Sequence, residues 1–464
     1  MKHIDIRDIF DKEEYLDQEV TVCGWVRTSR DSKNMAFLEL NDGTTFKHIQ
    51  IVVNKASYGD TGSLASCMKL GSSLKVVGTV VPSAVNKAGG VEINAKEITL
   101  LGESPADYTL QKKRHTMEFL RTMPQIRVRS NTFNAVFRVR SVLAASIHEY
   151  FQSNGYVYVN TPLITGSDCE GAGEMFQVTT RSFADAKECK SEEEFYADDF
   201  FGQKAGLSVS GQLEGEVAAM ALGKIYTFGP SFRAENSNTQ RHVAEFWHVE
   251  PEVAFAELPD VLEIAEDMMK HITSSVLEKC PDEMEFFDKR IEKGLLKKLD
   301  NVVNNDFEVL DYTKAIEILE KADADFKFPV SWGIDLQTEH ERYLTEQVCK
   351  KPVFVINYPK EIKSFYMKQN DDGKTVAAAD LLVPGVGEII GGSEREASYD
   401  KLVAAMKERN MDLSAYGDYL DLRKYGSVPH GGYGLGFERM VMYTTGMQNI
   451  RDVILYPRPV GSIR

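Results

Sequence analysis

The sequence predicts an α+β protein with a small all-β module at the N-terminus and a larger domain after it. The chain has 464 residues, which is enough for two or three domains. Residues 19–101 alternate apolar and polar side chains with the period of β-strands, whereas residues 131–154 repeat apolar side chains with the period of a helix and lead into a short strand at 156–160. We therefore expect a barrel module over residues 1–102, a linker over 103–129 and the main domain over 130–464.

Five strands account for the alternation in the N-terminal module. A turn at Asn41-Asp42-Gly43 follows the second strand, and a short helix is expected around residues 63–70, between the third and the fourth. Five strands with a helix at this point form the order of an oligonucleotide-binding barrel, or OB-fold. The strands are expected at residues 19–26, 35–40, 47–53, 73–81 and 91–101.

One face of this barrel is expected to bind nucleic acid. Strands two and three commonly form that face, and they carry Phe37, which can stack on a base, and Gln50, which can hydrogen-bond to one. Arg27 is placed to contact a phosphate or a base. The periodicity alone leaves open whether Phe37 belongs instead to the core of the barrel.

Composition and charge limit the setting in which the protein works. A net charge of −16 argues against nucleic acid if taken whole, but basic residues cluster in the barrel and the linker while acidic residues concentrate elsewhere. A solvated surface is the default interpretation of such a basic linker, and a contact with a nucleic-acid backbone is the alternative. Six cysteines lack the spacing of a zinc site or a disulfide framework, and no apolar run has the pattern of a signal peptide or a membrane span. We expect a cytoplasmic protein with reduced thiols.

Two motifs far apart in the main domain together indicate an ATP site. Arg233 and Glu235 are expected on one face of a strand, where a guanidinium can bind a phosphate and a carboxylate can accept from adenine, with Phe246 placed to stack on the base. In the second motif, spaced glycines let the backbone approach a ligand before Arg439, which can cover the other face of adenine. Taken singly, the first pattern is also typical of a solvated ion pair and the second of helix packing. The motifs are Phe232-Arg233-Ala234-Glu235 and Gly432-Tyr433-Gly434-Leu435-Gly436-Phe437-Glu438-Arg439.

In this order and behind such a barrel, the motifs resemble those of the class II aminoacyl-tRNA synthetases, in the subgroup for aspartate, asparagine and lysine. The barrel itself resembles the anticodon-binding module of that subgroup through Gly24-Trp25-Val26-Arg27, Phe37 and Gln50. The resemblance implies a catalytic domain built on an antiparallel sheet flanked by helices, with ATP and Mg²⁺ as cofactors. It also implies a homodimer formed through the helix, the strand and Pro162 that follow the linker, with a monomer as the alternative.

The resemblance assigns roles around ATP. Arg233 would bridge the α-phosphate and the substrate carboxylate, Arg439 would clamp the nucleotide, and His242 would contact the β- and γ-phosphates. Asp380 and Glu388 match the acidic pair that binds magnesium, although their spacing is one residue longer than in the bacterial aspartyl pattern. No catalytic side-chain nucleophile is required, because alignment and charge stabilisation are sufficient for this chemistry.

Further assignments concern the amino acid. The glycine-rich segment 167–176 looks like the lid over the substrate, with Glu170 facing its α-ammonium group. Ser210 and Gln212 are expected to alternate on the end of a strand and resemble the pair that holds the same group. The segment at about 180–204 is expected to be an acidic insertion.

Three positions point to asparagine as the substrate. Aspartyl enzymes carry a lysine where this chain has Gly215, so a cation for a substrate carboxylate is missing. Glu250 can accept from an amide NH2 group, and Arg395 can donate to an amide oxygen. The expected reaction is the ligation of asparagine to tRNA(Asn) through an asparaginyl adenylate.

Three alternatives differ from this expectation in specific features. An aspartyl-tRNA synthetase should have the lysine that Gly215 replaces. A free asparagine synthetase on the same catalytic fold would lack the barrel. A non-catalytic, synthetase-like RNA-binding protein would be expected to lose ATP-site residues, whereas Arg233, Glu235, Phe246 and Arg439 are all present.

Overall fold

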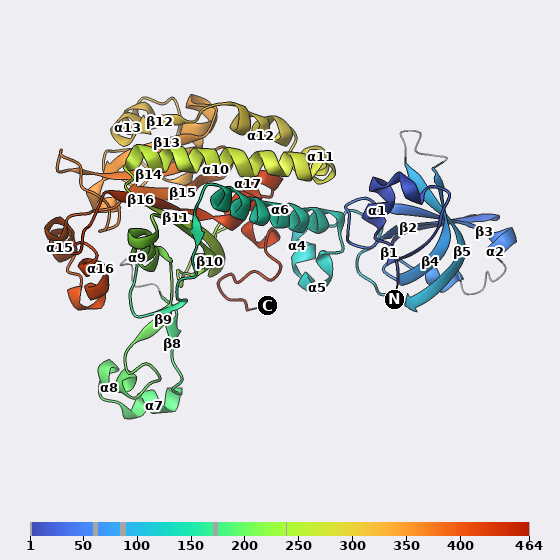
Figure 1. Cartoon of the computed structure of the whole chain (residues 1–464), viewed down its shortest axis with the longest axis horizontal. Helices are drawn as coiled ribbons and strands as arrows, with labels where there is room; N and C mark the ends of the chain where they lie inside the picture. The colour runs from blue at the N-terminus through green and yellow to red at the C-terminus, as the bar shows by residue number, and fades with distance from the viewer. Residues whose placement is uncertain (1, 59–63, 84–89, 170–174, 238, 464) are drawn as a thin grey trace. The chain divides into compact units, whose positions relative to one another are not determined.

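The computed structural model describes residues 2–58, 64–83, 90–169, 175–237 and 239–463. The chain divides into two compact units, Met1–Arg138 and Val139–Arg464 (Figure 1). The long helix α6 (Asn131–Ser153), predicted at residues 131–154, contains the boundary between them. Each unit is described by itself.

The first unit contains the predicted five-stranded barrel. Its strands close in the order β1-β2-β3-β5-β4, with β3 and β5 parallel and the other neighbours antiparallel. The short helix expected around residues 63–70 is α3, and a further short helix, α2, directly follows β3. The elements before α6 are α1 (Ile6–Asp11), β1 (Glu19–Asp31), β2 (Met35–Asn41), β3 (Ile49–Asn54), α2 (Lys55–Tyr58), α3 (Leu64–Cys67), β4 (Ser73–Pro82), β5 (Val91–Gly102), α4 (Met117–Arg121) and α5 (Pro124–Arg127).

The alternation of the sequence places one side of each strand in the barrel's core. On β2, Ala36, Leu38 and Leu40 are buried in the core, while Phe37 is half-buried on the opposite side of the strand. Phe37 is therefore not a core residue. β3 begins two residues later than predicted because the side-chain amide of Asn41 donates to the carbonyl oxygens of Thr45 and Lys47, each at 2.9 Å, and holds this segment as a loop.

The second unit is built on an eight-stranded sheet in the order β12-β13-β14-β15-β16-β11-β10-β6. The six strands from β13 to β10 are antiparallel to their neighbours, as predicted, and a parallel strand is added at each edge. These strands are β6 (Val157–Tyr158), β10 (Lys224–Phe232), β11 (Glu245–Ala254), β12 (Glu308–Asp311), β13 (Val353–Pro359), β14 (Thr375–Val383), β15 (Gly387–Glu394) and β16 (His430–Gly436).

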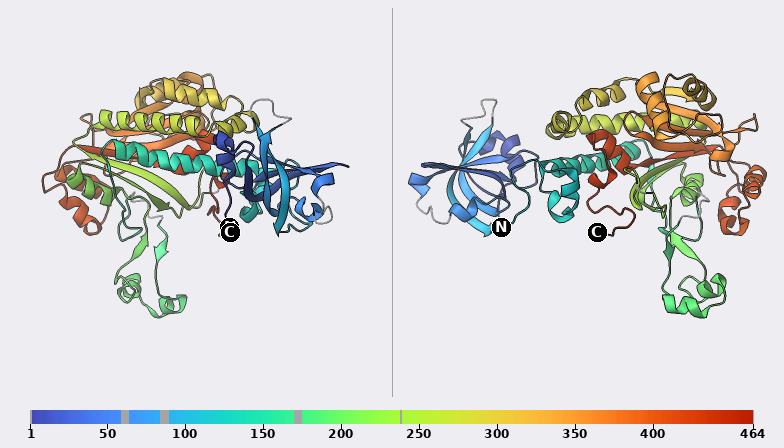
Figure 2. Two further views of the ribbon diagram at one scale, coloured as in Figure 1. Left: turned by 45° about the vertical axis from the view of Figure 1, so that its right-hand side comes forward. Right: turned by 180° about the vertical axis from the view of Figure 1, so that it is seen from behind.

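Helices cover the sheet (Figures 1 and 2). α10, the long yellow-green helix, packs against β14, β15 and β16, and α9 packs against β10 and β11. The helices are α9 (Gln212–Leu222), α10 (Leu258–Lys279), α11 (Pro281–Arg290), α12 (Leu295–Asn304), α13 (Tyr312–Glu320), α14 (Thr338–Arg342), α15 (Tyr399–Glu408), α16 (Gly417–Asp421) and α17 (Phe437–Thr445).

The alternation of β16 and β11 separates the core from the site. Tyr433 on β16 donates its hydroxyl to the sulfur of Met268 on α10 at 3.2 Å. Gly432 and Gly434, on either side of Tyr433, face the opposite side of the sheet. The side chains of Glu252 and His248 on β11 lie over these two glycines. The face of the sheet away from α10 therefore carries polar side chains.

The predicted insertion forms an arm that stands away from the sheet in both views of Figure 2. Its base is a three-stranded sheet of β7 (Ile164–Thr165), β8 (Gln177–Val178) and β9 (Ala205–Leu207). Its tip carries α7 (Phe183–Glu188) and α8 (Glu192–Ala197), each capped by a serine at its N-terminus.

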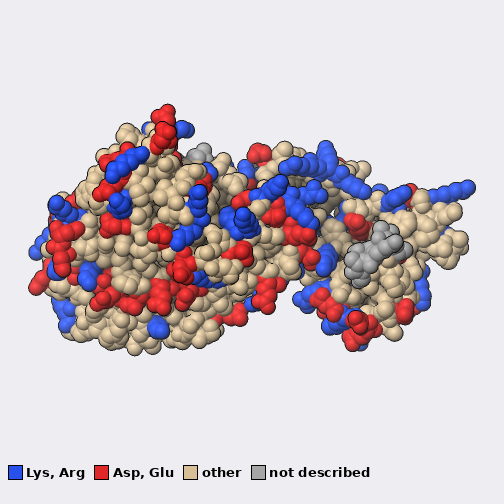
Figure 3. Space-filling view, turned by 90° about the horizontal axis from the view of Figure 1, so that it is seen from above, with Lys and Arg blue, Asp and Glu red and all other residues tan. Residues whose placement is uncertain are grey.

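The net charge is −16, but the side drawn in Figure 3 is not uniformly acidic. Acidic and basic side chains are interspersed on it. Among the described residues, every helix is too short or too polar to cross a bilayer.

Candidate active site

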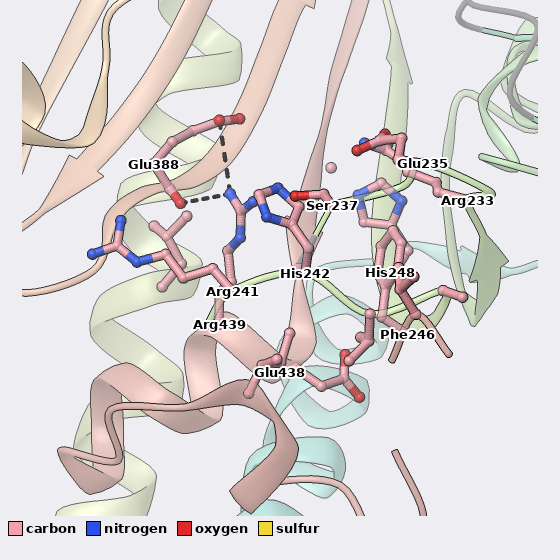
Figure 4. A pocket seen from close by; sticks show the side chains of 17 residues that line it. Arg233, Glu235, Ser237, Arg241, His242, Phe246, His248, Glu388, Glu438 and Arg439 are labelled. Atoms are coloured by element: carbon pink, nitrogen blue, oxygen red, sulfur yellow. Dashed lines mark hydrogen bonds and ion pairs between the residues drawn. The ribbon is translucent and has the colours of Figure 1, made fainter. Parts of the chain in front are cut away.

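The first half of the predicted ATP site lies at the end of β10 and at the start of β11. Arg233, Glu235 and Phe246 all line one cavity, together with His242 (Figure 4). The expectation that Arg233 and Glu235 share a strand face is wrong, because β10 ends at Phe232 and both residues lie in the loop that follows. The guanidinium carbon of Arg233 is 5.4 Å from the centre of the Phe246 ring.

The second half of the site comes from β16 and α17. Arg439 lies across the cavity from Arg233, and its Nη1 donates to the carbonyl oxygen of Glu388 at 2.9 Å (Figure 4). The same nitrogen is 3.7 Å from the Glu388 carboxylate. The structure therefore brings together two guanidinium groups that are 206 positions apart in the chain, the difference between 439 and 233.

The spaced glycines of β16 have a steric role. A side chain at Gly434 would collide with the ring of His248, and one at Gly432 would collide with Glu252 and with the carbonyl oxygen of Pro251. Glycine is thus required at both positions so that side chains of β11 can lie over the neighbouring strand. These two glycines are therefore explained by contacts between strands and not by helix packing.

His242 is half-buried between the arginines. Burial lowers the pKa of its imidazole, and the nearby Arg439 lowers it further. Its Nδ1 is 2.5 Å from the hydroxyl of Thr239. A neutral imidazole can contact a phosphate as a hydrogen-bond donor without adding a fourth positive charge to Arg233, Arg241 and Arg439.

A second cavity adjoins the first on the same face of the sheet. Four residues, Arg233, His248, Glu388 and Gly434, line both cavities. The second cavity also contains the predicted amino-acid residues Ser210, Gln212, Glu250 and Arg395. A group bound between the two cavities is therefore within reach of Arg233.

Arg395 is buried and bound by a carboxylate that the sequence analysis did not assign. Its Nη2 and Nε donate to the two carboxylate oxygens of Glu252, at 2.5 and 3.3 Å, and its Nη1 donates to the hydroxyl of Ser393 at 2.7 Å. Three of its five N–H groups are thus used. Burial raises the pKa of Glu252 to about 7, against the opposing effect of Arg395.

Glu250 is also buried and accepts from four protein groups. Gly211 N donates at 2.9 Å, the Thr227 hydroxyl at 3.1 Å and the Ser210 hydroxyl at short range, while His248 Nδ1 lies at 3.1 Å. Burial alone would raise the pKa of this carboxyl, but His248 and these hydrogen bonds outweigh it and lower the pKa to about 2. Glu250 therefore stays ionised at the wall of the cavity.

The expectation that Ser210 and Gln212 alternate on the end of a strand is wrong. Residues 208–211 form a turn, and Gln212 begins helix α9. The Ser210 hydroxyl accepts from Gln212 N at 3.2 Å, and the Gln212 amide donates to Glu216 at 3.0 Å. Both side chains still reach the second cavity, because the turn directs the start of α9 toward β11.

The predicted magnesium ligands converge above a glycine. A β-carbon built on Gly391 would lie 3.1 Å from Oε1 of Glu388 and 3.7 Å from Oδ1 of Asp380. Both residues lie on the hairpin of β14 and β15, where a β-bulge leaves Ile389 unpaired next to Glu388. Two carboxylates around an open space fit a magnesium ion whose other ligands are phosphate and water. No larger metal-binding group of three or more His, Cys, Asp or Glu residues occurs among the described residues.

Two charged residues next to this pair were missed by the sequence analysis. Lys363 is largely buried, with Nζ 2.5 Å from Oδ2 of Asp380. Glu341 accepts from the backbone N–H of Glu388 at 3.3 Å, and burial together with the Glu388 charge raises its pKa to about 8. Neither lies in a recognisable motif, so only the tertiary fold reveals them.

The remaining predicted residues have separate positions. Gln50 donates to Glu92 at 2.9 Å, and Arg27 donates to the side chain of Asn131 at 2.8 Å, both within the first unit. Burial lowers the pKa of Arg27. Glu170 lies outside the described residues.

Comparison with known families decides the classification. Residues 116–460 match the family model described as tRNA synthetases class II (D, K and N), and residues 20–101 match that of the OB-fold nucleic acid binding domain. The chain belongs to the class II (D, K and N) tRNA synthetases. The motifs around Arg233 and Arg439 thus lie within the matched region of this synthetase family.

Individual members of the family are similar over the whole chain. The asparagine–tRNA ligase of Clostridium novyi is 58% identical over 449 residues, which cover 97% of this chain and 96% of the relative. That of Clostridium botulinum is 57% identical over 450 residues, with coverage of 97% and 96%. The crystal structure of asparaginyl-tRNA synthetase from Pyrococcus horikoshii complexed with asparaginyl-adenylate superposes with a TM-score of 0.87 at 32% identity, covering 100% of this chain and 99% of that one.

Proposed function

We propose that the chain ligates asparagine to tRNA(Asn) in two steps, through an asparaginyl adenylate. The observation that carries this proposal is the shared wall of the two cavities, where Arg233 faces both the nucleotide motif and the amino-acid residues. The similarity to asparagine–tRNA ligases over nearly the full length supports the same reaction.

In the first step, an oxygen of the asparagine carboxylate forms a bond to the α-phosphorus of ATP while the bond from that phosphorus to the pyrophosphate oxygen breaks. Arg233 at the shared wall binds the carboxylate and the α-phosphate and so aligns them. Arg439 and His242 bind the other side of the nucleotide, where charge leaves with pyrophosphate. In the second step, a ribose hydroxyl of the terminal adenosine attacks the acyl carbon and AMP leaves.

Asp380 and Glu388 would hold Mg²⁺ above Gly391. When bound, this ion supplies positive charge that neutralises the phosphate oxygens of ATP. The two carboxylates are placed on the side of the shared wall that Arg439 approaches, since Arg439 contacts Glu388.

The amino acid is selected by Arg395 and Glu250. The two N–H groups of Arg395 that have no partner among the described residues donate to the amide oxygen of asparagine, and the carboxylate of Glu250 accepts from its amide NH2. Gly215 on α9 adds no cation beside Arg395 and Glu252. A β-carbon there would lie 3.5 Å from Ile225 and 3.6 Å from Glu252, so a side chain at this position would start beside the carboxylate that binds Arg395.

The barrel binds the anticodon of the tRNA. Phe37 supports this role because its half-buried ring lies on the side of β2 away from the core, where a base can stack on it. Ser210, Gln212 and Glu170 act at the α-ammonium end of the substrate.

The active form is a cytoplasmic homodimer that associates through the β6 edge and the segment after it. Support comes from large apolar side chains that remain exposed around this edge: Val157, Tyr158, Leu163, Ile164, Leu222 and Phe255. Exposed apolar patches of this kind mark association surfaces. Light scattering on the purified protein measures the oligomeric state, and a monomer at micromolar concentration would contradict this part of the proposal.

The decisive experiment is amino-acid-dependent exchange of pyrophosphate into ATP, tested with all twenty amino acids. Asparagine alone should support rapid exchange, followed by charging of a tRNA(Asn) transcript. Exchange with aspartate at the same rate would overturn the substrate assignment, and the absence of exchange with every amino acid would overturn the reaction.

A further inference from the structure

Lys363 is a largely buried cation inside the acidic part of the proposed active site. It follows the short helical turn Lys360–Ile362 after β13, and its side chain is only 14% exposed. Its ammonium group lies 2.5 Å from Oδ2 of Asp380 and 4.0 Å from the centre of the Tyr358 ring. An ion pair and an aromatic face thus fix the position of the nitrogen.

Four carboxyl groups surround this region. Asp380 binds Lys363 directly, Glu388 and Asp335 also act on it electrostatically, and Glu341 lies against the backbone of Glu388. Arg439 approaches from the nucleotide side and contacts Glu388 rather than Asp380. The two predicted magnesium ligands therefore have different cationic partners within the described part of the chain.

The geometry places Lys363 on one oxygen of Asp380 and leaves the other toward the space above Gly391. Oδ2 is the atom bound by Lys363, whereas Oδ1 is the atom nearer to the position of a Gly391 β-carbon. Oδ2 thus has a cationic partner while Oδ1 faces the site, and the Tyr358 side chain also hydrogen-bonds to this carboxylate. A carboxylate held in this way has a fixed orientation, and its charge is already balanced.

Charge balance has a consequence for metal binding. Two adjacent carboxylates, the buried Asp380 and the more exposed Glu388, attract a divalent metal ion whether or not ATP is present when no cation lies beside them. With the ammonium group in place, a free divalent ion meets a nearby positive charge as well as the carboxylates, and this repulsion is strong in a buried site. The phosphates of ATP add negative charge and restore the attraction.

We propose that Lys363 is a positioning residue that holds Asp380 and makes divalent-cation binding depend on ATP. The proposal rests on the proposed function only in taking Asp380 and Glu388 as the magnesium ligands. Lys363 acts through Asp380 and does not need to touch the substrate.

The test is the binding of Mn²⁺ alone, measured by electron paramagnetic resonance on the full-length protein without nucleotide. Lys363→Met removes the charge but keeps the length of the side chain, and it should bind Mn²⁺ at least about tenfold more tightly than the wild type. Lys363→Arg keeps the charge and should bind Mn²⁺ as the wild type does. Lys360→Met, three residues earlier and paired with Glu408 at 3.3 Å, is the matched control and should change nothing.

A double variant identifies the route of the effect. Adding Asp380→Asn to Lys363→Met should abolish the gain in Mn²⁺ affinity, because the carboxylate that Lys363 releases is no longer present. Lys363→Gln, which retains a hydrogen-bond donor toward Asp380, provides a second neutral variant if Lys363→Met does not fold, and it should show the same gain.

Unchanged Mn²⁺ affinity in the folded neutral variants, accompanied only by a lower unfolding temperature, would overturn the proposal and leave Lys363 a structural residue. Failure of the proposed function is a separate outcome. It would appear in the wild type as the absence of asparagine-dependent pyrophosphate exchange, with the Mn²⁺ comparison between variants still measurable.

Discussion

Two glutamates on β11 should respond in opposite ways to the same substitution. Glu250 and Glu252 are two residues apart, both are buried and both line the second cavity. Glu252 is bound to Arg395, whereas Glu250 is held by hydroxyl and N–H donors. Replacing either by glutamine removes one negative charge with little change of volume, so differences between the variants report on the partners.

Glu250→Gln should weaken the use of asparagine. The substitution removes a charged acceptor for the substrate amide, and a hydrogen bond to a charged group contributes about 1.5–3 kcal/mol. We therefore expect kcat/KM for asparagine to fall roughly 10- to 150-fold. The protein should remain folded, because the hydroxyls of Ser210 and Thr227 can turn to accept from the new NH2 group.

Glu252→Gln should instead improve the use of aspartate relative to asparagine. Arg395 loses the nearer of its two carboxylate partners and keeps Glu216 at 4.0 Å, so its buried charge is balanced less well and favours a substrate that brings a negative charge. The ratio of kcat/KM for aspartate to that for asparagine should rise by about tenfold or more, equivalent to at least about 1.4 kcal/mol.

Pyrophosphate exchange with both amino acids measures these effects. Glu245→Gln is the matched control, since Glu245 lies on the same strand and is exposed. Equal losses with asparagine and aspartate in both glutamine variants would refute the division of roles between the two carboxylates, as would an unchanged ratio in Glu252→Gln.

Three further predictions follow from the site and the barrel. Arg233→Ala and Arg439→Ala should each abolish pyrophosphate exchange while leaving tRNA binding, measured by filter retention, close to the wild type; normal exchange in Arg233→Ala would contradict the ATP assignment. Phe37→Ala should weaken tRNA binding by roughly 1–3 kcal/mol without changing exchange, and a loss of both activities would contradict a surface role. Because folding lowers the Glu250 pKa from 4.5 to about 2, its stabilisation is present above pH 4.5 and is lost as the pH falls toward 2. It amounts to about 3 kcal/mol, so acid denaturation monitored by tryptophan fluorescence should depend less on pH in Glu250→Gln, and an identical profile would contradict this contribution.

The sequence predicts the barrel well because its strands are patterned by a single local rule. Alternation shows that Phe37 and its neighbours on β2 face opposite sides of the strand. Which of the two sides is buried becomes clear only from the core of the barrel, which contains Ala36, Leu38 and Leu40. The boundary of β3 could not be predicted, since it depends on the amide of Asn41 reaching across to Lys47. Side-chain hydrogen bonds of this kind leave no periodic signal.

The sequence predicts which residues line the two cavities better than it predicts the secondary structure in which these residues lie. Arg233 and Glu235 line the cavity from a loop, and Gln212 does so from the start of a helix, although strand positions were expected for all three. The motif spacing identifies which residues meet, while tertiary hydrogen bonds decide how the chain delivers them. Lys363 was missed because its role depends on the pairing of β13 with β14, which brings it to Asp380.

The buried charges of the amino-acid cavity are paired before any substrate enters, and this pairing itself discriminates between substrates. Glu252 balances Arg395, Asp380 balances Lys363, and Glu250 is stabilised by fixed donors. The neutral amide of asparagine adds no charge to this arrangement and can use the remaining N–H groups of Arg395. Aspartate would bring a carboxylate to a guanidinium that Glu252 already pairs, and an uncompensated buried charge costs several kcal/mol. On this argument, the selectivity comes as much from Glu252, which neutralises the arginine, as from the groups that touch the amide.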